Sequence, residues 1–136
     1  MKLVENSKGG NELEALAKVV STLMGTQIAA HLLHLSITGE ASYARHIALQ
    51  EYYEAALDKV DHIAEEVQGH HGKLLDIKAP VIEVPETVED FVNQLDNLYI
   101  ITAEGQMITK CSALISTLDE LKTLINKTKY KLLFLR

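Results

Sequence analysis

The chain has 136 residues, which is enough for one domain with its own core. Apolar residues make up 47% and charged residues 24%, a globular rather than a disordered composition. The net charge of −6 argues against a surface that coats nucleic acid. A single cysteine, Cys111, excludes an intrachain disulfide and a thiolate metal cage, and it favours a cytoplasmic protein. We expect neither a signal peptide nor an apolar run long enough to span a membrane.

The first half of the chain is predicted to form a helical hairpin, because its apolar residues recur with helical spacing and not with the alternation of strands. Residues 1–10 are expected to be a flexible tail. Asn11 is expected to cap a helix that reaches about residue 38, where Gly39 breaks it. A second helix is expected over residues 41–68, ending at Gly69.

The second half begins with a long connection, residues 69–85, which holds both prolines. Antiparallel neighbours need only a few linking residues, so this length predicts a crossover between parallel helices. The segment Thr87–Asp90 has the pattern of a capping box for a third helix, which weakens near Gly105. A fourth helix is expected over residues 113–135. The sequence therefore predicts an all-α, ferritin-like four-helix bundle as a single domain over residues 11–136.

One face of the second predicted helix collects side chains that bind metals. At about 100° per residue, the face opposite the apolar side carries His46, Gln50, Glu54, Asp61 and Glu65. Taken alone, such a face is usually a solvated acidic surface. However, His34 precedes Gly39 by five residues and His46 follows it by seven, so an antiparallel hairpin brings the two imidazoles together. Neutral imidazole with carboxylate is a suitable ligand set for iron or zinc.

A metal site that uses this whole face needs two chains. His46 and Asp61 are fifteen residues apart, about 22 Å along a helix, whereas metal–ligand bonds are near 2 Å. A two-fold dimer with antiparallel copies of the helix would place His34 and His46 of one chain against Asp61 and Glu65 of the other. Residues 28–37, which are apolar almost all round, fit such an interface.

The stretch from His34 to Glu65 resembles the signature of Dps-type miniferritins, the DNA-protection-during-starvation proteins. That signature has a His, then a Gly, a second His twelve residues after the first, an Asp four residues later and a closing Asp-x-x-x-Glu. Gly39, His46, Asp61 and Glu65 fall at the matching offsets without a gap. The resemblance covers about 32 residues directly, and the rest of the chain agrees only in the order of its helices.

Three positions depart from the family pattern. Gln50 stands where the signature has Asp, Leu35 where Trp is frequent, and Glu66 where Arg is common. The chain is also short for the family. It is most similar to the compact Dps-like proteins of tailed phages, through residues 43–69 and 128–136.

This resemblance implies that Fe(II) binds at two-fold interfaces, that peroxide or oxygen oxidises it, and that Fe(III) is stored inside a hollow cytoplasmic shell, usually of twelve subunits. The host cytoplasm is expected if a phage encodes the chain. The implied ligands of this non-haem iron are His34, His46, Asp61 and Glu65, with Gln50 and Glu54 as doubtful additions. No catalytic residue beyond the ligands is implied, and neither membrane binding nor strong DNA binding is expected.

Two other interpretations stay open. The same fold can serve as a catalytically impaired, structural or partner-binding phage protein, which Gln50 favours. Alternatively, the chain is a helical module unrelated to metal, in which His34 is a hydrogen-bonded core histidine. A ferritin site inside one bundle is rejected, because that site needs Glu-x-x-His on two helices and the sequence has no such pair.

Overall fold

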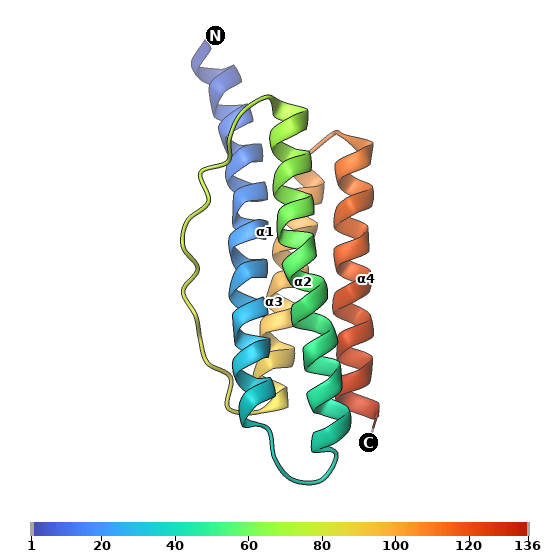
Figure 1. The fold of residues 1–136 in the computed structure, drawn as a ribbon. Helices are drawn as coiled ribbons and strands as arrows, with labels where there is room; N and C mark the ends of the chain where they lie inside the picture. The colour runs from blue at the N-terminus through green and yellow to red at the C-terminus, as the bar shows by residue number, and fades with distance from the viewer. Residues whose placement is uncertain (1, 136) are drawn as a thin grey trace.

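The computed structural model describes residues 2–135, with side chains described over residues 11–135. Within that range it contains four helices and no strand: α1 (Lys2–Ser36), α2 (Ser42–His71), α3 (Val88–Ile108) and α4 (Ser112–Phe134) (Figure 1). The predicted all-α four-helix bundle is therefore confirmed.

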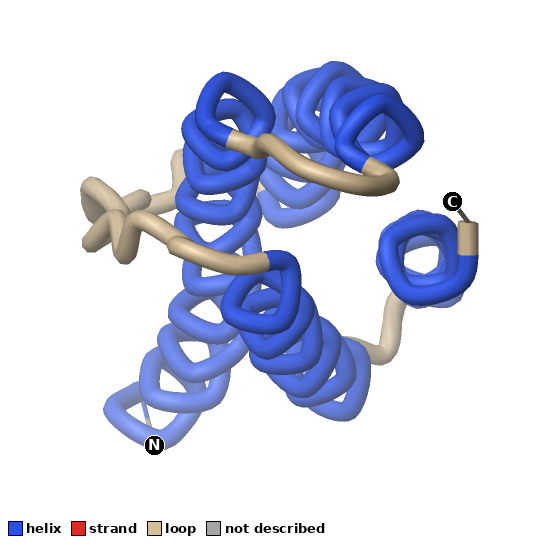
Figure 2. Tube along the Cα trace, turned by 90° about the horizontal axis from the view of Figure 1, so that it is seen from below, coloured by secondary structure: helices blue, strands red, loops and turns tan. Residues whose placement is uncertain are grey.

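The connectivity is short turn, long crossover, short turn. From the N-terminus α1 runs down the bundle in Figure 1, α2 returns, and the connection then descends beside α1 to the start of α3. As a result α2 and α3 are parallel. Each of these two helices has its backbone beside α1 and α4, whereas α2 and α3 meet only through long side chains in the core. They therefore occupy opposite corners of the bundle, which Figure 2 shows end on. This crossover is the one that the length of the connection predicted.

The core lies between the four helices, and the predicted apolar side of α2 faces it. Buried on that side are Ala48, Tyr52, Ala56, Val60, Ile63 and Val67. Tyr52 is fully buried and meets the Phe91 ring of α3 edge to face, with 5.6 Å between the ring centroids. Its hydroxyl lies 2.7 Å from Thr26 Oγ1 of α1, which itself donates to the Leu23 carbonyl. The buried phenol is thus paired and links three helices.

Burial of Tyr52 predicts a loss of stability in alkali. Desolvation raises the pKa of the phenol far above its ordinary value of 10.0, and the Thr26 hydrogen bond only partly opposes this. Above pH 10 the unfolded chain therefore releases this proton while the folded chain retains it. Stability should fall as pH rises, by up to about 1.4 kcal/mol per pH unit from this group. Urea unfolding at pH 9 and pH 11 should show a smaller drop for Tyr52→Phe than for the parent. Tyr43→Phe, at a 79% exposed position, should lose as much stability between the two pH values as the parent does. An equal loss of stability in all three proteins would refute the expectation.

Two predicted boundaries in the first half of the chain are wrong. α1 begins at Lys2, so Asn11 does not cap it. Whether residues 1–10 are flexible stays a prediction, because their side chains lie outside the described part. α2 continues through Gly69 to His71 and ends where Gly72 adopts φ 65° and donates its N–H to the Gln68 carbonyl. A glycine inside a helix costs only about 1 kcal/mol, so Gly69 did not have to end it.

The predicted start of α3 is confirmed, whereas its predicted weakening is not. Thr87 and Asp90 form a complete capping box. α3 then runs through Gly105 without interruption. A Cβ atom at Gly105 would lie 3.2 Å from the Val19 side chain of α1, so this glycine allows close packing of α1 and α3 and does not break the helix.

One segment of α1, Asn11–Ser36, is long and apolar enough to cross a membrane by length and composition, contrary to the expectation stated above. Half of its most apolar window is buried inside the bundle. A core helix of a soluble bundle has the same composition, because it must be apolar on several sides.

Candidate metal centre

The turn between α1 and α2 has a tight, left-handed geometry. Gly39 has φ 93° and Ala41 has φ 64°, and the Ser42 N–H donates to the Gly39 carbonyl over 3.2 Å. Positive φ suits glycine and strains an alanine. The turn reverses the chain within a few residues and sets the end of α1 beside the start of α2.

This turn brings His34 and His46 into direct contact, as the sequence predicted. Their rings stack with centroids 3.7 Å apart and an interplanar angle of 24°. Each ring also bonds the backbone of the other residue: His34 Nδ1 lies 3.0 Å from the His46 carbonyl oxygen, and His46 Nδ1 lies 3.2 Å from that of His34. His34 is only 8% exposed, whereas His46 is half-buried.

These reciprocal bonds determine where the imidazole protons lie. A carbonyl oxygen only accepts, so both Nδ1 atoms carry hydrogen. In the neutral rings the lone pair is therefore on Nε2, which makes no hydrogen bond within the part of the chain that the structure describes. A backbone carbonyl that holds Nδ1–H is the usual support of a metal-binding histidine. The pair has the chemistry of two oriented nitrogen ligands.

Two further aromatic rings complete this end of the bundle. Tyr53 stacks on His31 with centroids 4.2 Å apart and meets His34 edge to face at 5.3 Å. Tyr53 is not among the residues that the sequence pattern predicts for this site. The available signal was its spacing of seven residues from His46, two helical turns that place both side chains on one face of α2.

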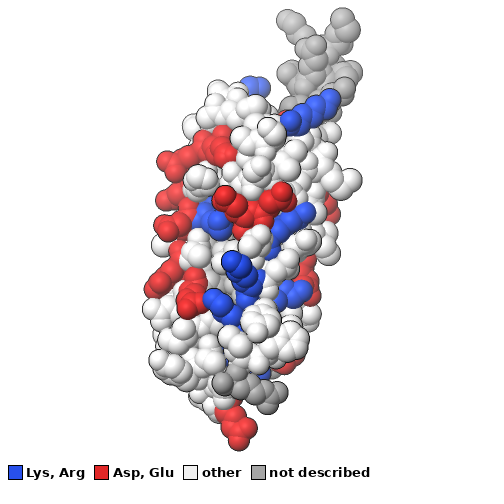
Figure 3. Space-filling view, turned by 90° about the vertical axis from the view of Figure 1, so that its right-hand side faces the viewer, with Lys and Arg blue, Asp and Glu red and all other residues white. Residues whose placement is uncertain are grey.

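The predicted carboxylate ligands lie far from this histidine pair. Asp61 and Glu65 are exposed on α2, four to five turns beyond His46, and neither has an ion-pair or hydrogen-bond partner among residues 11–135. Figure 3 shows acidic side chains in a row along one edge of the molecule, beside the lysines of the neighbouring surface. Accordingly, no group of three or more metal-binding side chains forms within the described residues of one chain. This agrees with the reach calculated from the sequence.

The doubtful ligands are already engaged with each other. The Gln50 side-chain amide donates to Glu54 Oε1 over 3.1 Å, one turn beyond His46. Glu66, at the position where the resemblance led us to expect Arg, accepts a hydrogen bond from Thr117 of α4 over 2.8 Å. This departure from the family pattern therefore links α2 to α4.

An apolar stripe runs along the exposed side of α1 next to the histidines. Ile28 and Leu32 are each 37% exposed and Leu35 is 70% exposed, while Ala29 and Leu33 of the same segment are buried. Residues 28–37, which are apolar almost all round, therefore have one side in the core and one side uncovered. Spacings of four and three residues place the uncovered side chains on a single face.

Comparison with known proteins identifies a family but no function. The model of DUF5856, described as a family of unknown function, matches residues 34–132, which include all four predicted ligands. That is well over half of the chain, so the chain belongs to this family. Searches of curated proteins and of solved structures each returned no match.

Proposed function

We propose that this member of the DUF5856 family is a Dps-like miniferritin. In this proposal the protein binds Fe(II) between two chains of a two-fold dimer, oxidises it with peroxide or oxygen, and stores Fe(III) inside a hollow oligomer of about twelve subunits. The observation that carries the proposal is the pair of stacked histidines whose Nδ1 atoms are held by carbonyls. The Dps signature from His34 to Glu65 supplies the type of metal and the reaction.

The histidine pair suits Fe(II) binding because it is oriented before the ion arrives. Each Nε2 offers its lone pair without a change of tautomer, and the bonds from Nδ1 to backbone carbonyls orient both rings. Two neutral ligands leave the charge of the ion uncompensated. Carboxylates must therefore complete the site, and carboxylate oxygen is also a good donor for the Fe(III) product.

Asp61 and Glu65 of a second chain are the carboxylates best placed for this task. They are unpaired and exposed, and their distance from His46 along α2 excludes them from the site of their own chain. An antiparallel second copy of α2 brings them to the histidines, and the uncovered stripe of Ile28, Leu32 and Leu35 adds apolar area to the same contact. The bound iron offsets the repulsion between the two acidic rows.

In the proposed reaction the protein holds the Fe(II) ions, which are the substrate, between the histidines of one chain and the carboxylates of the other. Hydrogen peroxide takes one electron from each of two Fe(II) ions and two protons from solvent, which yields two Fe(III) ions and two waters. The histidines hold Fe(II), and the carboxylates stabilise the higher charge of Fe(III), so electron loss becomes more favourable at the site than in solution.

Iron oxidation by the purified apoprotein tests the proposal. Fe(II) is added without oxygen, peroxide or air is admitted, and Fe(III) absorbance is followed. The parent should oxidise iron at least about tenfold faster than the double variant His34→Ala, Glu65→Ala and keep the product soluble. His62→Ala removes an exposed imidazole from the same helix and should match the parent. Equal rates for the parent and the double variant would overturn the proposed function.

A second candidate function is a structural or partner-binding oligomer that does not turn over iron. The observation in its favour is Gln50, a neutral amide bonded to Glu54 at the position where Dps proteins have Asp. In the same assay Gln50→Asp separates the two functions. Rapid iron oxidation by Gln50→Asp together with an inactive parent would support the second function. Iron oxidation by the parent at a rate comparable to that of Gln50→Asp, and above the uncatalysed rate, would support the first.

A further inference from the structure

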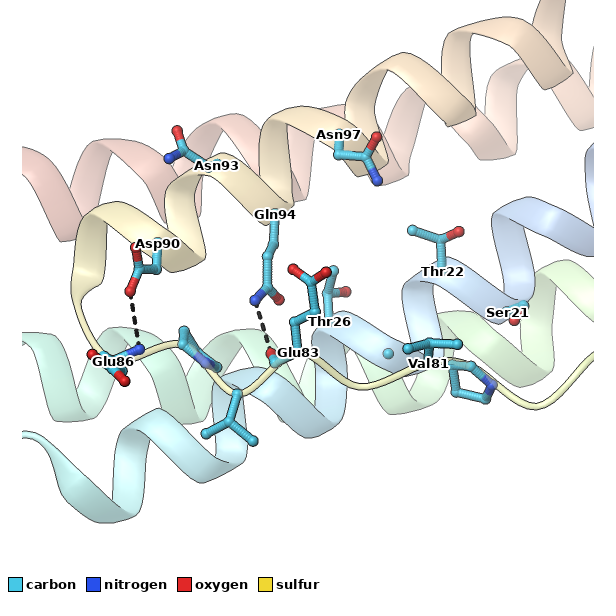
Figure 4. A pocket seen from close by; sticks show the side chains of 14 residues that line it. Ser21, Thr22, Thr26, Val81, Glu83, Glu86, Asp90, Asn93, Gln94 and Asn97 are labelled. Atoms are coloured by element: carbon cyan, nitrogen blue, oxygen red, sulfur yellow. Dashed lines mark hydrogen bonds between the residues drawn. The ribbon is translucent and has the colours of Figure 1, made fainter.

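A polar cleft of about 700 Å³ lies between α1, α3 and the crossover, and no residue of α2 lines it. Its walls are α1 around residues 21–26, the first turns of α3 over residues 90–97, and the crossover segment 80–86 (Figure 4). This volume is in the range of pockets that hold small molecules. The cleft lies apart from the histidine pair, and the inference below does not depend on the proposed iron chemistry.

The crossover that forms one wall is held in place although it has no regular secondary structure. Ser21 Oγ of α1 donates to the Lys78 carbonyl over 2.8 Å, and the Gln94 amide of α3 donates to the Glu83 carbonyl over 2.9 Å. Near the first of these bonds, a Cβ atom at Gly25 would lie 3.3 Å from Pro80 Cβ, so glycine allows the crossover to approach α1 closely. The cleft is therefore a pre-formed concavity with a fixed wall.

The lining has a consistent chemical character. Nine of its fourteen residues are polar: three hydroxyl residues from α1, three amide residues from α3 and three carboxylate residues, while the others are glycine, proline and valine. No Lys, Arg or His of the described residues lines it. A pocket with this composition has negative potential. It repels phosphates and carboxylates and attracts cations.

The atoms left for a ligand are mostly acceptors. Gln94 uses its Nε2 on the crossover, so its Oε1 is the atom that remains. The Asp90 carboxylate already accepts from the N–H groups of Glu86 and Thr87. By contrast, the Glu83 carboxylate has no partner among residues 11–135, and Figure 4 shows it rising between Gln94 and Thr26.

We propose that this cleft binds a small organic ammonium ion, and that a linear aliphatic diamine is its preferred ligand. One ammonium group would bond the Glu83 carboxylate and Gln94 Oε1 beside it. The polar row from Asn93 to Asn97 spans about 6 Å along α3, comparable to the length of a four-carbon diamine. The carboxylate of Glu86 at the end of the crossover supplies the second negative charge, and Pro80 and Pro85 offer apolar surface to the methylenes.

Calorimetric titration of the full chain with 1,4-diaminobutane tests this proposal. Binding should saturate, should weaken with added salt, and should be about fivefold weaker for Glu83→Gln, which corresponds to about 1 kcal/mol. Glu104→Gln makes the same charge change on exposed α3 surface outside the cleft and should alter affinity less than twofold. In NMR spectra, the side-chain amide signals of Gln94 and Asn97 should shift during the titration of the parent.

Two results would overturn the proposal. Equal affinities of Glu83→Gln and Glu104→Gln would mean that the diamine responds only to the net charge of −6 and does not occupy the cleft. If MgCl2 at the same concentration shifts the same amide signals and displaces the diamine, the cleft holds inorganic cations and does not select an organic one. Neither result bears on iron oxidation, which is measured separately.

Discussion

A mixture of two inactive variants is expected to regain about a quarter of the parent's iron oxidation. One variant carries His34→Ala and His46→Ala, and the other carries Asp61→Ala and Glu65→Ala. In a mixed two-fold dimer, one site combines both sets of substitutions and the other retains all four ligands. Random pairing makes about half of the dimers mixed, so about one quarter of all sites are complete. This result is expected because the histidines and the carboxylates lie too far apart along α2 for a single chain to provide both ligand types to one ion.

The experiment requires subunit exchange, which is achieved by refolding the two variants together. Each variant refolded alone should remain at the uncatalysed rate, and circular dichroism should show that each is as helical as the parent. The parent refolded in the same way sets the reference rate. If the mixture stays at the uncatalysed rate although mixed oligomers are isolated through two affinity tags, the intersubunit site is wrong. Such a result would leave the fold unaffected and would favour the structural alternative.

The largest loss of stability is expected for Phe91→Ala. Phe91 is fully buried at the start of α3, where its ring meets the Tyr52 ring of α2 edge to face. Truncation to alanine removes a buried aromatic ring and leaves a cavity between the two parallel helices, at a cost of about 3–5 kcal/mol. Urea unfolding at neutral pH should show the midpoint falling at unchanged slope.

Met107→Ala is the matched control on the same helix, because Met107 is 85% exposed. Its effect should stay within about 0.5 kcal/mol. If Phe91→Ala lowers the free energy of unfolding by less than about 1.5 kcal/mol, the bundle closes the cavity. The contact between the Phe91 and Tyr52 rings then contributes little to stability. Iron oxidation by this variant, assayed well below its unfolding midpoint, should resemble that of the parent, since Phe91 lies in the core and touches no proposed ligand.

The fold was largely predictable because it depends on local and periodic features. Helical spacing of apolar residues, two prolines in one long connection and the capping pattern at Thr87 predict four helices and a crossover, and the structure has both. The helix ends were less predictable. Gly39 lies in the hairpin turn, Gly69 lies inside α2 and Gly105 allows close packing, although all three are glycines. The role of Gly105 depends on neighbours that are distant in sequence, whereas Gly39 is set apart by its positive φ and Gly69 has no neighbour within 4 Å of a Cβ position.

The candidate metal centre was predicted in part. The spacing of His34 and His46 around Gly39 anticipated their contact, because the hairpin geometry follows from local chain reversal. It did not anticipate the reciprocal bonds to backbone carbonyls, nor the stacking of Tyr53 on His31. Both depend on how α1 and α2 are rotated against each other, which the packing of the whole core decides.

From the amino-acid sequence alone one can predict the class of fold, the order of the helices and the separation of imidazoles from carboxylates along α2. These are consequences of chain periodicity and of the fixed rise of a helix. The three-dimensional arrangement is needed to see which nitrogen of each histidine remains open and which apolar residues of α1 stay uncovered. It also shows that the crossover, Thr22 and Asn97 line a polar cleft. These features arise where segments far apart in the chain meet, and a one-dimensional pattern contains no information on the distance between them.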